Sequence, residues 1–314
     1  MVQNNIEKTS DTPMQRITNS ELDKLIGVKF PVLDHGFVML VDYMGGDSSI
    51  VQAARVSYGS GTKTFREDEG LIRYLMRHDH TTPFEMVEFK FAMRMPFFVA
   101  RQIVRHRTVS INEYSARYSV VPDFYYIPEK DDITAQSATN RQGRDSEKKL
   151  PNEVVEWFRN SVTEHSKDSY SLYEKALESG IPRELARMVL PLNYYTEWYW
   201  KINLHNMFHF LQLRIDPHAQ EETRRYAMAM AEIVKIAVPV AYKAFEDFSL
   251  HAVRFSEKES MAVKDMLNGA SFEDSANRNG LRLYKEDGTA FKTGEGPEFI
   301  QKMERLTKRN MLRV

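Results

Sequence analysis

The sequence predicts a mixed α/β protein that does not have the Rossmann dinucleotide-binding fold. Segments with strand periodicity and segments with helix periodicity alternate irregularly along the 314 residues. No Gly-x-Gly-x-x-Gly follows a predicted strand, and the sequence contains no Walker-type phosphate loop. A bound dinucleotide would therefore have to be held by side chains.

Apolar residues at helical or alternating spacing define the elements. Gly45-Gly46-Asp47 predicts a turn, after which Asp47 or Ser48 could cap a helix. Residues 85–95 alternate between polar and apolar side chains, which predicts a half-exposed strand that ends at Pro96. The apolar face of this strand consists of Val87, Phe89, Phe91 and Met93. The other predicted strands and extended segments are residues 36–44, 118–127 and 193–203.

Helical spacing is strongest in the second half of the chain. Residues 218–248 predict one long helix toward the C-terminus, with a kink at Pro239. The other predicted helices are residues 20–26, 48–56, 67–77, 97–106, 152–179, 183–189 and 205–214. Residues 129–151 are dense in polar and charged side chains and predict a solvated loop. The residues beyond about 256 predict a charged tail with Gly-rich turns.

Composition excludes several classes of chemistry. The chain has no cysteine, which rules out disulfides, thiolate metal sites and cysteine nucleophiles. The net charge of -1 argues against a protein that coats nucleic acid or an anionic membrane. No apolar run is long enough to span a bilayer, and the first residues lack the apolar core of a signal peptide. These features predict a cytoplasmic protein.

The most unusual stretch runs from Gln102 to Tyr118. Gln102, Arg105 and His106 share one helix face, and Arg107 follows at the helix end. Together with Arg117, these cations could hold two anionic groups, because a guanidinium matches phosphate oxygens. A structural reading competes with this one. Cations at a helix end complement its dipole, and the segment Ser110–Glu113 matches a helix capping box.

Two further clusters contain histidines. His78-Asp-His80 suggests a metal ligand pair, but no third ligand follows at a characteristic spacing, so we predict no metal site. The other cluster combines cations with amide and imidazole groups, and for each residue alone a core or capping role is the commoner case. Its members are Arg183, Glu184, Arg187, Asn203, His205, His209 and Arg214.

Arg105-His106-Arg107, followed after seven residues by Ser115, resembles the signature of the flavin-dependent thymidylate synthases. Further blocks resemble the family in family order, over about residues 33 to 250. They include Ala53-Ala-Arg-Val-Ser57, His80-x-Thr-Pro-Phe-Glu85, Ile181-Pro-Arg-Glu-x-Ala-Arg187 and Leu213-Arg214. The resemblance implies a mostly antiparallel sheet flanked by helices. It also implies an N-terminal arm (1–32), a synthase domain (33–250) and a C-terminal extension (251–314).

The resemblance implies the reaction as well. Such enzymes convert deoxyuridylate (dUMP) to thymidylate (dTMP); methylenetetrahydrofolate supplies the carbon, FAD carries the hydride and NADPH is the reductant. They are homotetramers with shared active sites. The cofactor contacts implied here are Ser57, His80, Thr82, Arg105, His106, Arg107, Glu113, Asn203, Leu204, His205 and His209. The implied dUMP contacts are Gln102, Ile103, Val104, Arg105, Glu113, Tyr114, Ser115, Ala116, Arg117, Arg187 and Arg214.

Two positions depart from some family members. His205 stands where Arg is also expected, and His209 stands where Asn is also expected. A neutral histidine donates from a single nitrogen, whereas arginine brings a permanent charge. The contacts with FAD at these two positions can therefore differ from those in other members of the family.

Without a thiol, carbon 5 of uracil must be activated by other means. A positive group near the uracil carbonyl and N3 stabilises the developing negative charge, and Arg214 is the candidate that matches the family arginine. Ser115 is the alternative as a nucleophile, but no base is evident beside it.

Two other functions remain open from the sequence. One is folate- and flavin-dependent methylation of uridine in tRNA. The other is a non-enzymatic module that binds single-stranded nucleic acid, in which Tyr114 and Tyr118 stack on bases. The near-zero net charge weighs against nucleic acid as a partner.

Overall fold

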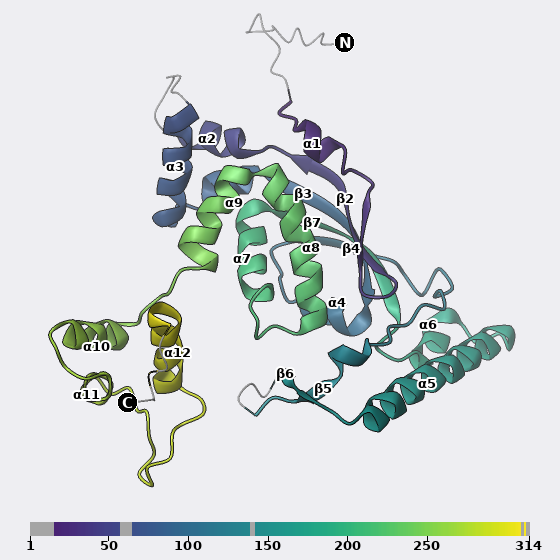
Figure 1. Ribbon diagram of the computed structural model, residues 1–314. Helices are drawn as coiled ribbons and strands as arrows, with labels where there is room; N and C mark the ends of the chain where they lie inside the picture. The colour runs from purple at the N-terminus through teal and green to yellow at the C-terminus, as the bar shows by residue number, and fades with distance from the viewer. Residues whose placement is uncertain (1–15, 57–64, 139–141, 309–310, 312–314) are drawn as a thin grey trace, which may run out of the picture. The chain divides into compact units, whose positions relative to one another are not determined.

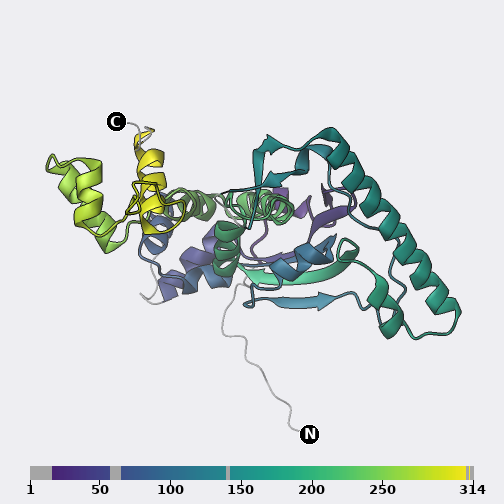
Figure 2. The same ribbon diagram turned by 90° about the horizontal axis from the view of Figure 1, so that it is seen from below.

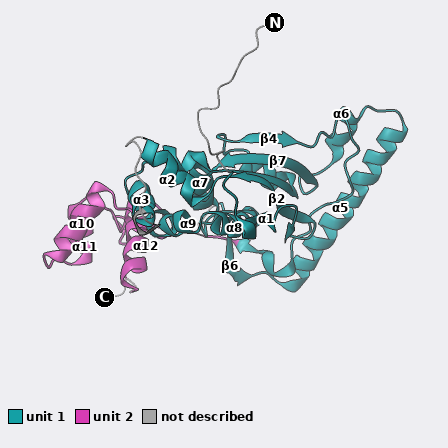
Figure 3. Cartoon of the chain, turned by 90° about the horizontal axis from the view of Figure 1, so that it is seen from above, with its two compact units in different colours: residues 1–135, 142–250 teal, residues 136–141, 251–314 magenta. Residues whose placement is uncertain are grey.

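The computed structural model describes residues 16–56, 65–138, 142–308 and 311 of the chain. The chain divides into two compact units, which Figure 3 colours separately. The first unit comprises residues 1–135 and 142–250, and the second comprises residues 136–141 and 251–314. Among the described residues, no helix is both long and apolar enough to cross a membrane.

An antiparallel sheet forms the centre of the first unit (Figure 1). In the described residues its strand order is β1-β2-β3-β7-β4, and each neighbouring pair is antiparallel. The strands are β1 (Lys29–Val32), β2 (Gly36–Met44), β3 (Glu88–Pro96), β4 (Ser110–Glu113) and β7 (Tyr195–Asn203). The expected mostly antiparallel sheet is confirmed.

Strand β3 shows the alternation that the sequence predicts. Phe89, Phe91 and Met93 are fully buried, whereas the polar residues of the other face, Glu88, Lys90 and Arg94, are partly exposed. The first residues of the predicted strand instead form a 3-10 turn, η1 (Thr82–Met86). Pro83 fixes a helical φ at the start of this turn, so the strand begins later than expected.

Helices α4 (Phe97–Ile103), α7 (Leu204–Arg214) and α8 (Glu221–Ala237) pack on the sheet. Figures 1 and 2 show α7 and α8 lying across one face of it. The core between the layers contains large aromatic side chains that are fully buried, including Trp200 and Phe210. Burying a side chain of this kind contributes roughly 1.5–3 kcal/mol. The packing fixes where α4 and α7 end, and the candidate site lies at those ends.

The kink predicted at Pro239 is a break between α8 and a separate helix, α9 (Pro239–Phe245). The carboxylate of Asp47 accepts hydrogen bonds from the backbone N–H groups of Val240 and Ala241, each over 2.9 Å. Burial raises the pKa of Asp47, although these two hydrogen bonds oppose the rise. Asp47 begins helix α2 (Asp47–Val56) as expected, but its side chain caps a helix distant in sequence. The other helical elements here are α1 (Ser20–Asp23), α3 (Phe65–Arg77) and η4 (Glu246–Leu250).

The remaining helices of the first unit are α5 (Asn152–Glu178), α6 (Arg183–Ala186) and the short turn η3 (Arg187–Val189). They agree with the predicted helices 152–179 and 183–189. The predicted extended segment 118–127 is largely irregular, with one bridge between Tyr125 and Tyr194. Tyrosine hydroxyls of α5 hold it in place: Tyr170 donates to the carbonyl of Val121 over 3.0 Å. Side-chain hydrogen bonds thus replace a strand ladder.

Several short strands correct the sequence prediction. Strand β1 lies in the segment expected to be a loose arm, and β4 forms at Ser110–Glu113, where a capping box had been the alternative. The segment expected to be a solvated loop contains β5 (Thr134–Gln136) and β6 (Arg144–Lys149), which pair with each other. These strands are rich in polar residues, so the apolar alternation that marks a strand is absent.

The second unit also differs from the expected tail. Its described residues form helices α10 (Glu257–Leu267), α11 (Phe272–Arg278) and α12 (Glu295–Thr307) around buried Phe299, Leu281 and Leu283. The buried carboxylate of Glu259 completes a capping box with Ser256 and accepts from Lys302 Nζ over 2.8 Å. The high charge content of this segment is therefore compatible with a small core.

Candidate active site

The Arg-His-Arg motif lies in the loop between α4 and β4. Helix α4 ends at Ile103, and the backbone N–H of His106 donates to the carbonyl of Ile103 over 3.0 Å. The predicted helix 97–106 is therefore shorter than expected, and its last residues turn back instead. This turn presents Arg105, His106 and Arg107 beside the end of α7.

Helix α7 brings Arg214 to the same place. The side chain of Asn203 caps the start of α7 by accepting from the backbone N–H of Asn206 over 3.0 Å. Arg214 is the last residue of the helix, where a cation complements the helix dipole. Its Nε donates to Nε2 of His106 over 3.0 Å. The two residues lie 108 positions apart in the sequence. The sheet brings them together, because α4 follows β3, α7 follows β7, and β3 pairs with β7.

The contact with Arg214 defines the state of His106. Because Nε2 accepts a hydrogen bond, the imidazole is neutral and carries its proton on Nδ1. Burial, the charge of Arg214 and the neighbouring His209 lower the pKa of His106 to about 4. The His106 ring also makes an edge contact with Phe210, with ring centroids 4.9 Å apart. His106 is therefore a neutral acceptor for Arg214 at physiological pH.

A pocket of about 500 Å³ opens beside this pair. Its polar lining consists of Arg105, His106, Arg107, Thr108, Asn206, His209 and Arg214. Val109, Ile202 and Leu213 supply apolar walls. Within the described residues, no carboxylate lines this pocket. Such a donor set fits an anionic ligand with a flat apolar part, because arginine forks bind phosphate oxygens.

The second group of predicted residues lies at the other end of β4. Ser115, Ala116 and Arg117 follow that strand, and the N–H of Arg117 donates to Ser115 Oγ over 3.3 Å. Arg117 Nη2 also donates to Glu184 of α6 over 3.0 Å, and Arg187 lies exposed in η3. The segment and the start of η3 thus form a second basic surface.

Several other predicted residues near the two groups have structural partners or are buried. Glu113 Oε1 accepts from Thr196 Oγ1 over 2.7 Å. The hydroxyl of Tyr114 donates to the carbonyl of Val120 over 2.8 Å. Ile103 is fully buried in the main core and Ala116 is buried in the cluster under α5, whereas Val104 is exposed. The contacts of Glu113 and Tyr114 hold the backbone at the end of β4, between the Arg-His-Arg motif and Ser115.

The remaining predicted contacts lie apart from the pocket lining. His80 is exposed, with Tyr74 and His78 nearby, and Thr82 begins η1. In the described residues, no group of three or more possible ligands could hold a metal ion. Leu204 is fully buried, and His205 is half-buried on α7. Ser57 lies outside the described residues.

Sequence reasoning missed several residues at the site. Asn206 and Leu213 line the pocket together with His209, and their spacing of three and four on α7 was a usable signal. Gln102 is held by two residues that no motif indicates. Its Nε2 donates to Gln220 Oε1, and its Oε1 accepts from Thr223 Oγ1 over 3.3 Å. Both partners belong to the start of α8.

Comparison with known proteins agrees with this geometry. The family described as "Thymidylate synthase complementing protein" matches residues 39–240. A flavin-dependent thymidylate synthase of Rickettsia bellii is 51% identical over 267 residues, which cover 81% of this chain and 90% of the relative. Those of Ehrlichia ruminantium and Ruegeria pomeroyi are 50% and 47% identical; they cover 87% and 89% of this chain and 91% and 93% of their own lengths.

A solved structure of the UMP/dUMP methylase PolB from Streptomyces cacaoi, bound with 5-Br dUMP, is also similar. It has a TM-score of 0.64 and 32% sequence identity, and the match covers 70% of this chain and 99% of that one. The match to the family extends over more than half of the chain, and the curated relatives are close in sequence. The chain therefore belongs to the family of flavin-dependent thymidylate synthases.

Proposed function

We propose that this chain converts dUMP to dTMP, with methylenetetrahydrofolate as the carbon donor, FAD as the hydride carrier and NADPH as the reductant. The curated relatives carry the name of this activity, and the solved neighbour is titled a UMP/dUMP methylase. A mononucleotide ligand in that neighbour favours dUMP over tRNA as the methyl acceptor. We assign the synthase domain to residues 33–250, which contain the pocket.

The pocket beside His106 and Arg214, whose described lining contains no carboxylate, carries the proposal. Arg105, Arg107 and His209 supply donors that suit the diphosphate of FAD, and the apolar walls suit a flat ring. The residues present therefore fit the cofactor. When bound, FAD supplies the hydride, which no amino-acid side chain can supply. The protein must bind and orient its ligands and exclude water around them.

Arg214 is the residue that we assign to activation of the uracil. Burial lowers its pKa, but a guanidinium remains protonated in proteins. Its Nε is engaged by His106, which holds the guanidinium plane and leaves the terminal nitrogens to face a ligand. A fixed positive charge there stabilises negative charge as it develops on the pyrimidine. The mechanism requires no thiol, in agreement with a chain that contains no cysteine.

We also propose that the active site is shared between subunits of a homotetramer. The motif loop precedes Ser110, whereas Ser115 and Arg117 follow Glu113, so β4 separates the two groups by roughly 10 Å or more. Both groups are implied in binding one small nucleotide. A second copy of the chain would bring its Ser115 segment to the pocket of the first. Exposed apolar side chains on α5 and η3, such as Trp157 and Met188, are suited to such contacts.

The test is a methyl-acceptor assay with purified protein. Incubation with FAD, NADPH and methylenetetrahydrofolate should yield dTMP from free dUMP, identified by mass spectrometry. Parallel reactions replace dUMP with unmodified tRNA or omit the folate. Product in tRNA but not in the nucleotide would refute the substrate assignment. Formation of dTMP without the folate would refute the assignment of the carbon donor.

A further inference from the structure

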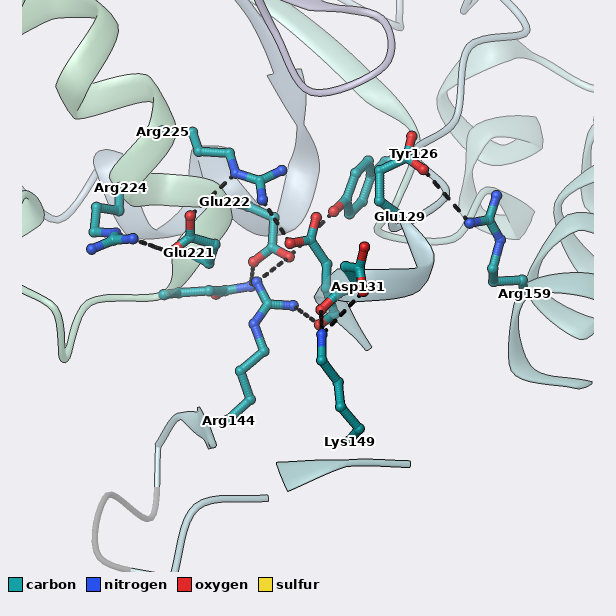
Figure 4. Close-up of polar contacts among 12 residues, drawn as sticks. Tyr126, Glu129, Asp131, Arg144, Lys149, Arg159, Glu221, Glu222, Arg224 and Arg225 are labelled. Carbon is teal, nitrogen blue, oxygen red and sulfur yellow. Dashed lines mark hydrogen bonds and ion pairs between the residues drawn. The ribbon is translucent and has the colours of Figure 1, made fainter. Parts of the chain in front are cut away.

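Glu222 is a deeply buried carboxylate at the start of α8, with only 4% of its surface exposed. Its partners come from three segments, and Figure 4 labels two of them, Tyr126 and Arg144, beside Glu222. Arg144 Nη2 donates to Oε1 over 2.9 Å, and the hydroxyl of Tyr126 donates to the same oxygen over 3.3 Å. Oε2 accepts from Gln220 Nε2 over 2.9 Å. Each of these contacts supplies a hydrogen to the carboxylate.

The charge of Glu222 fixes the orientation of Gln220. An ionised carboxylate can only accept hydrogen bonds, so Gln220 must direct its nitrogen toward Glu222. The oxygen of the same carboxamide then points the other way. That oxygen accepts from Nε2 of Gln102. The direction of the first hydrogen bond therefore determines the direction of the second.

Thr223 completes the arrangement on the other side of Gln102. This residue is fully buried on α8, and its hydroxyl donates to Oε1 of Gln102 over 3.3 Å. The carboxamide of Gln102 is therefore held at both ends, with its nitrogen toward Gln220 and its oxygen toward Thr223. A carboxamide nitrogen carries two hydrogens, so Gln102 retains a second N–H whose direction the network fixes.

Arg144 anchors the far end of this chain of contacts. It lies in β6, and its Nη1 also donates to the carbonyl of Asp132 over 2.6 Å. The side chain of Asp132 pairs in turn with Arg225 of α8 over 2.6 Å. A buried carboxylate without such a partner would be strongly destabilising. Strand β6 thus supplies the cation that pairs with Glu222 and holds its carboxylate in place.

We propose that Glu222, Gln220 and Thr223 are positioning residues, which orient the carboxamide of Gln102 to donate one N–H to dUMP. The inference rests on the proposed function, because the resemblance to the family implies that Gln102 contacts dUMP. These positioning residues lie beyond Arg214 and belong to none of the motifs named above. They act through Gln102 and do not themselves touch the nucleotide.

The experiment compares Thr223→Val with Thr223→Ser. Valine has the shape of threonine but removes the donor, whereas serine retains it. Thr223→Val should raise the KM for dUMP about tenfold, since one hydrogen bond to substrate loses its fixed direction. Turnover at saturating dUMP should stay within about twofold of wild type, because Arg214 is unchanged. Thr223→Ser should show the wild-type KM, because serine keeps the hydroxyl.

Gln220→Met provides a second variant, which removes both hydrogen bonds while keeping the length of the side chain. It should raise the KM for dUMP like Thr223→Val and leave the flavin content unchanged, with a lower Tm because the buried Glu222 loses one donor. Arg224→Gln is the matched control: Arg224 lies on the same turn of α8 but pairs with Glu221. It should show the wild-type KM.

Wild-type KM values in both Thr223→Val and Gln220→Met would overturn the inference. So would a fall in kcat and Tm in parallel, with KM unchanged, because that pattern indicates a purely structural role. Wild-type protein that methylates no dUMP would refute the proposed function, and the inference with it. The activity of the wild-type protein on dUMP thus distinguishes a failure of the inference from a failure of the proposed function.

Discussion

The Nε of Arg214 donates to Nε2 of His106 over 3.0 Å, and this contact joins the family motif to the end of α7. His106 contributes by accepting this bond, not by carrying a charge. Burial and two neighbouring basic groups keep the imidazole neutral, with its pKa lowered to about 4. The positive charge at the centre of the pocket therefore belongs to the guanidinium groups, with Arg214 held in a fixed direction.

Replacing Arg214 tests its assignment to uracil activation. Arg214→Ala should reduce kcat by on the order of 100-fold or more, because loss of one preorganised donor costs about 3 kcal/mol of transition-state stabilisation. FAD should remain bound, which the flavin absorbance near about 450 nm reports. Arg214→Lys keeps the charge but loses the planar fork, and its turnover should lie between those of wild type and alanine. Wild-type turnover in Arg214→Ala would contradict the assignment.

The protonation state of His106 can be measured directly. Nitrogen NMR should show a proton on Nδ1 and none on Nε2 near about pH 7. A protonated Nε2 would be incompatible with the hydrogen bond from Arg214.

The lowered pKa of His106 also predicts how stability depends on pH. The ordinary value is 6.5 and the folded value is about 4, so the unfolded state binds more protons between these two limits. The stability that the neutral His106 imidazole contributes is fully present above the ordinary pKa of 6.5. It is lost as the pH falls toward the folded pKa of about 4. The difference in unfolding free energy between wild type and His106→Gln (wild type minus variant) should therefore be smaller at about pH 5 than at about pH 7. A difference that does not change with pH would exclude this account.

Gly36 illustrates how closely the sheet is packed against α8. A Cβ at this position would lie 1.9 Å from Tyr226 Oη and 2.6 Å from the carbonyl of Val32. Gly36→Ala should lower the free energy of unfolding by about 1–3 kcal/mol, measured by chemical denaturation. Gly70→Ala is the control, since a Cβ there meets nothing within 4 Å and alanine favours the helix.

A double-mutant cycle identifies the source of that cost. Tyr226→Phe removes the hydroxyl that donates to the carbonyl of Arg94 over 2.7 Å, so it is destabilising in the wild-type background. In the Gly36→Ala background the same change also removes a clash and should cost less. Equal costs in the two backgrounds would show that Tyr226 is not the obstacle.

Subunit mixing tests the shared active site. Arg214→Ala and Arg187→Ala should each be inactive alone, because one lacks the pocket arginine and the other lacks an arginine of the second basic surface. Refolding a 1:1 mixture should recover about a quarter of wild-type turnover, since random association pairs one intact pocket with one intact partner surface in that proportion. A mixture as inactive as its components would indicate that each chain builds its site alone.

Much of the sheet could be predicted because its central strand has a strong period of two. In β3 the side chains of Phe89, Phe91 and Met93 are buried, as the alternation requires. Strands β5 and β6 could not be predicted, because they are short, polar and stabilised by pairing with each other. The segment Ser110–Glu113 fits both a capping box and a strand, and pairing with β7 decides in favour of the strand.

The residues of the candidate site could likewise be predicted only in part from the sequence. The motif residues Arg105, His106 and Arg107 could be identified from local spacing, and the structure brings them together with His209 and Arg214. Gln220 and Thr223 could not be identified, because their contacts with Gln102 depend on the packing of α8 against α4. The side chain of Asp47 is a similar case, since its partners lie on α9.

Anaerobic reoxidation of the reduced flavin tests the central claim most directly. Protein with bound FAD is reduced by NADPH, and its absorbance is followed as ligands are added one at a time. We predict that the oxidised spectrum returns only when dUMP and methylenetetrahydrofolate are both present, with formation of dTMP in the same amount. Reoxidation by the folate without dUMP, or a purified protein that takes up no FAD, would contradict the account.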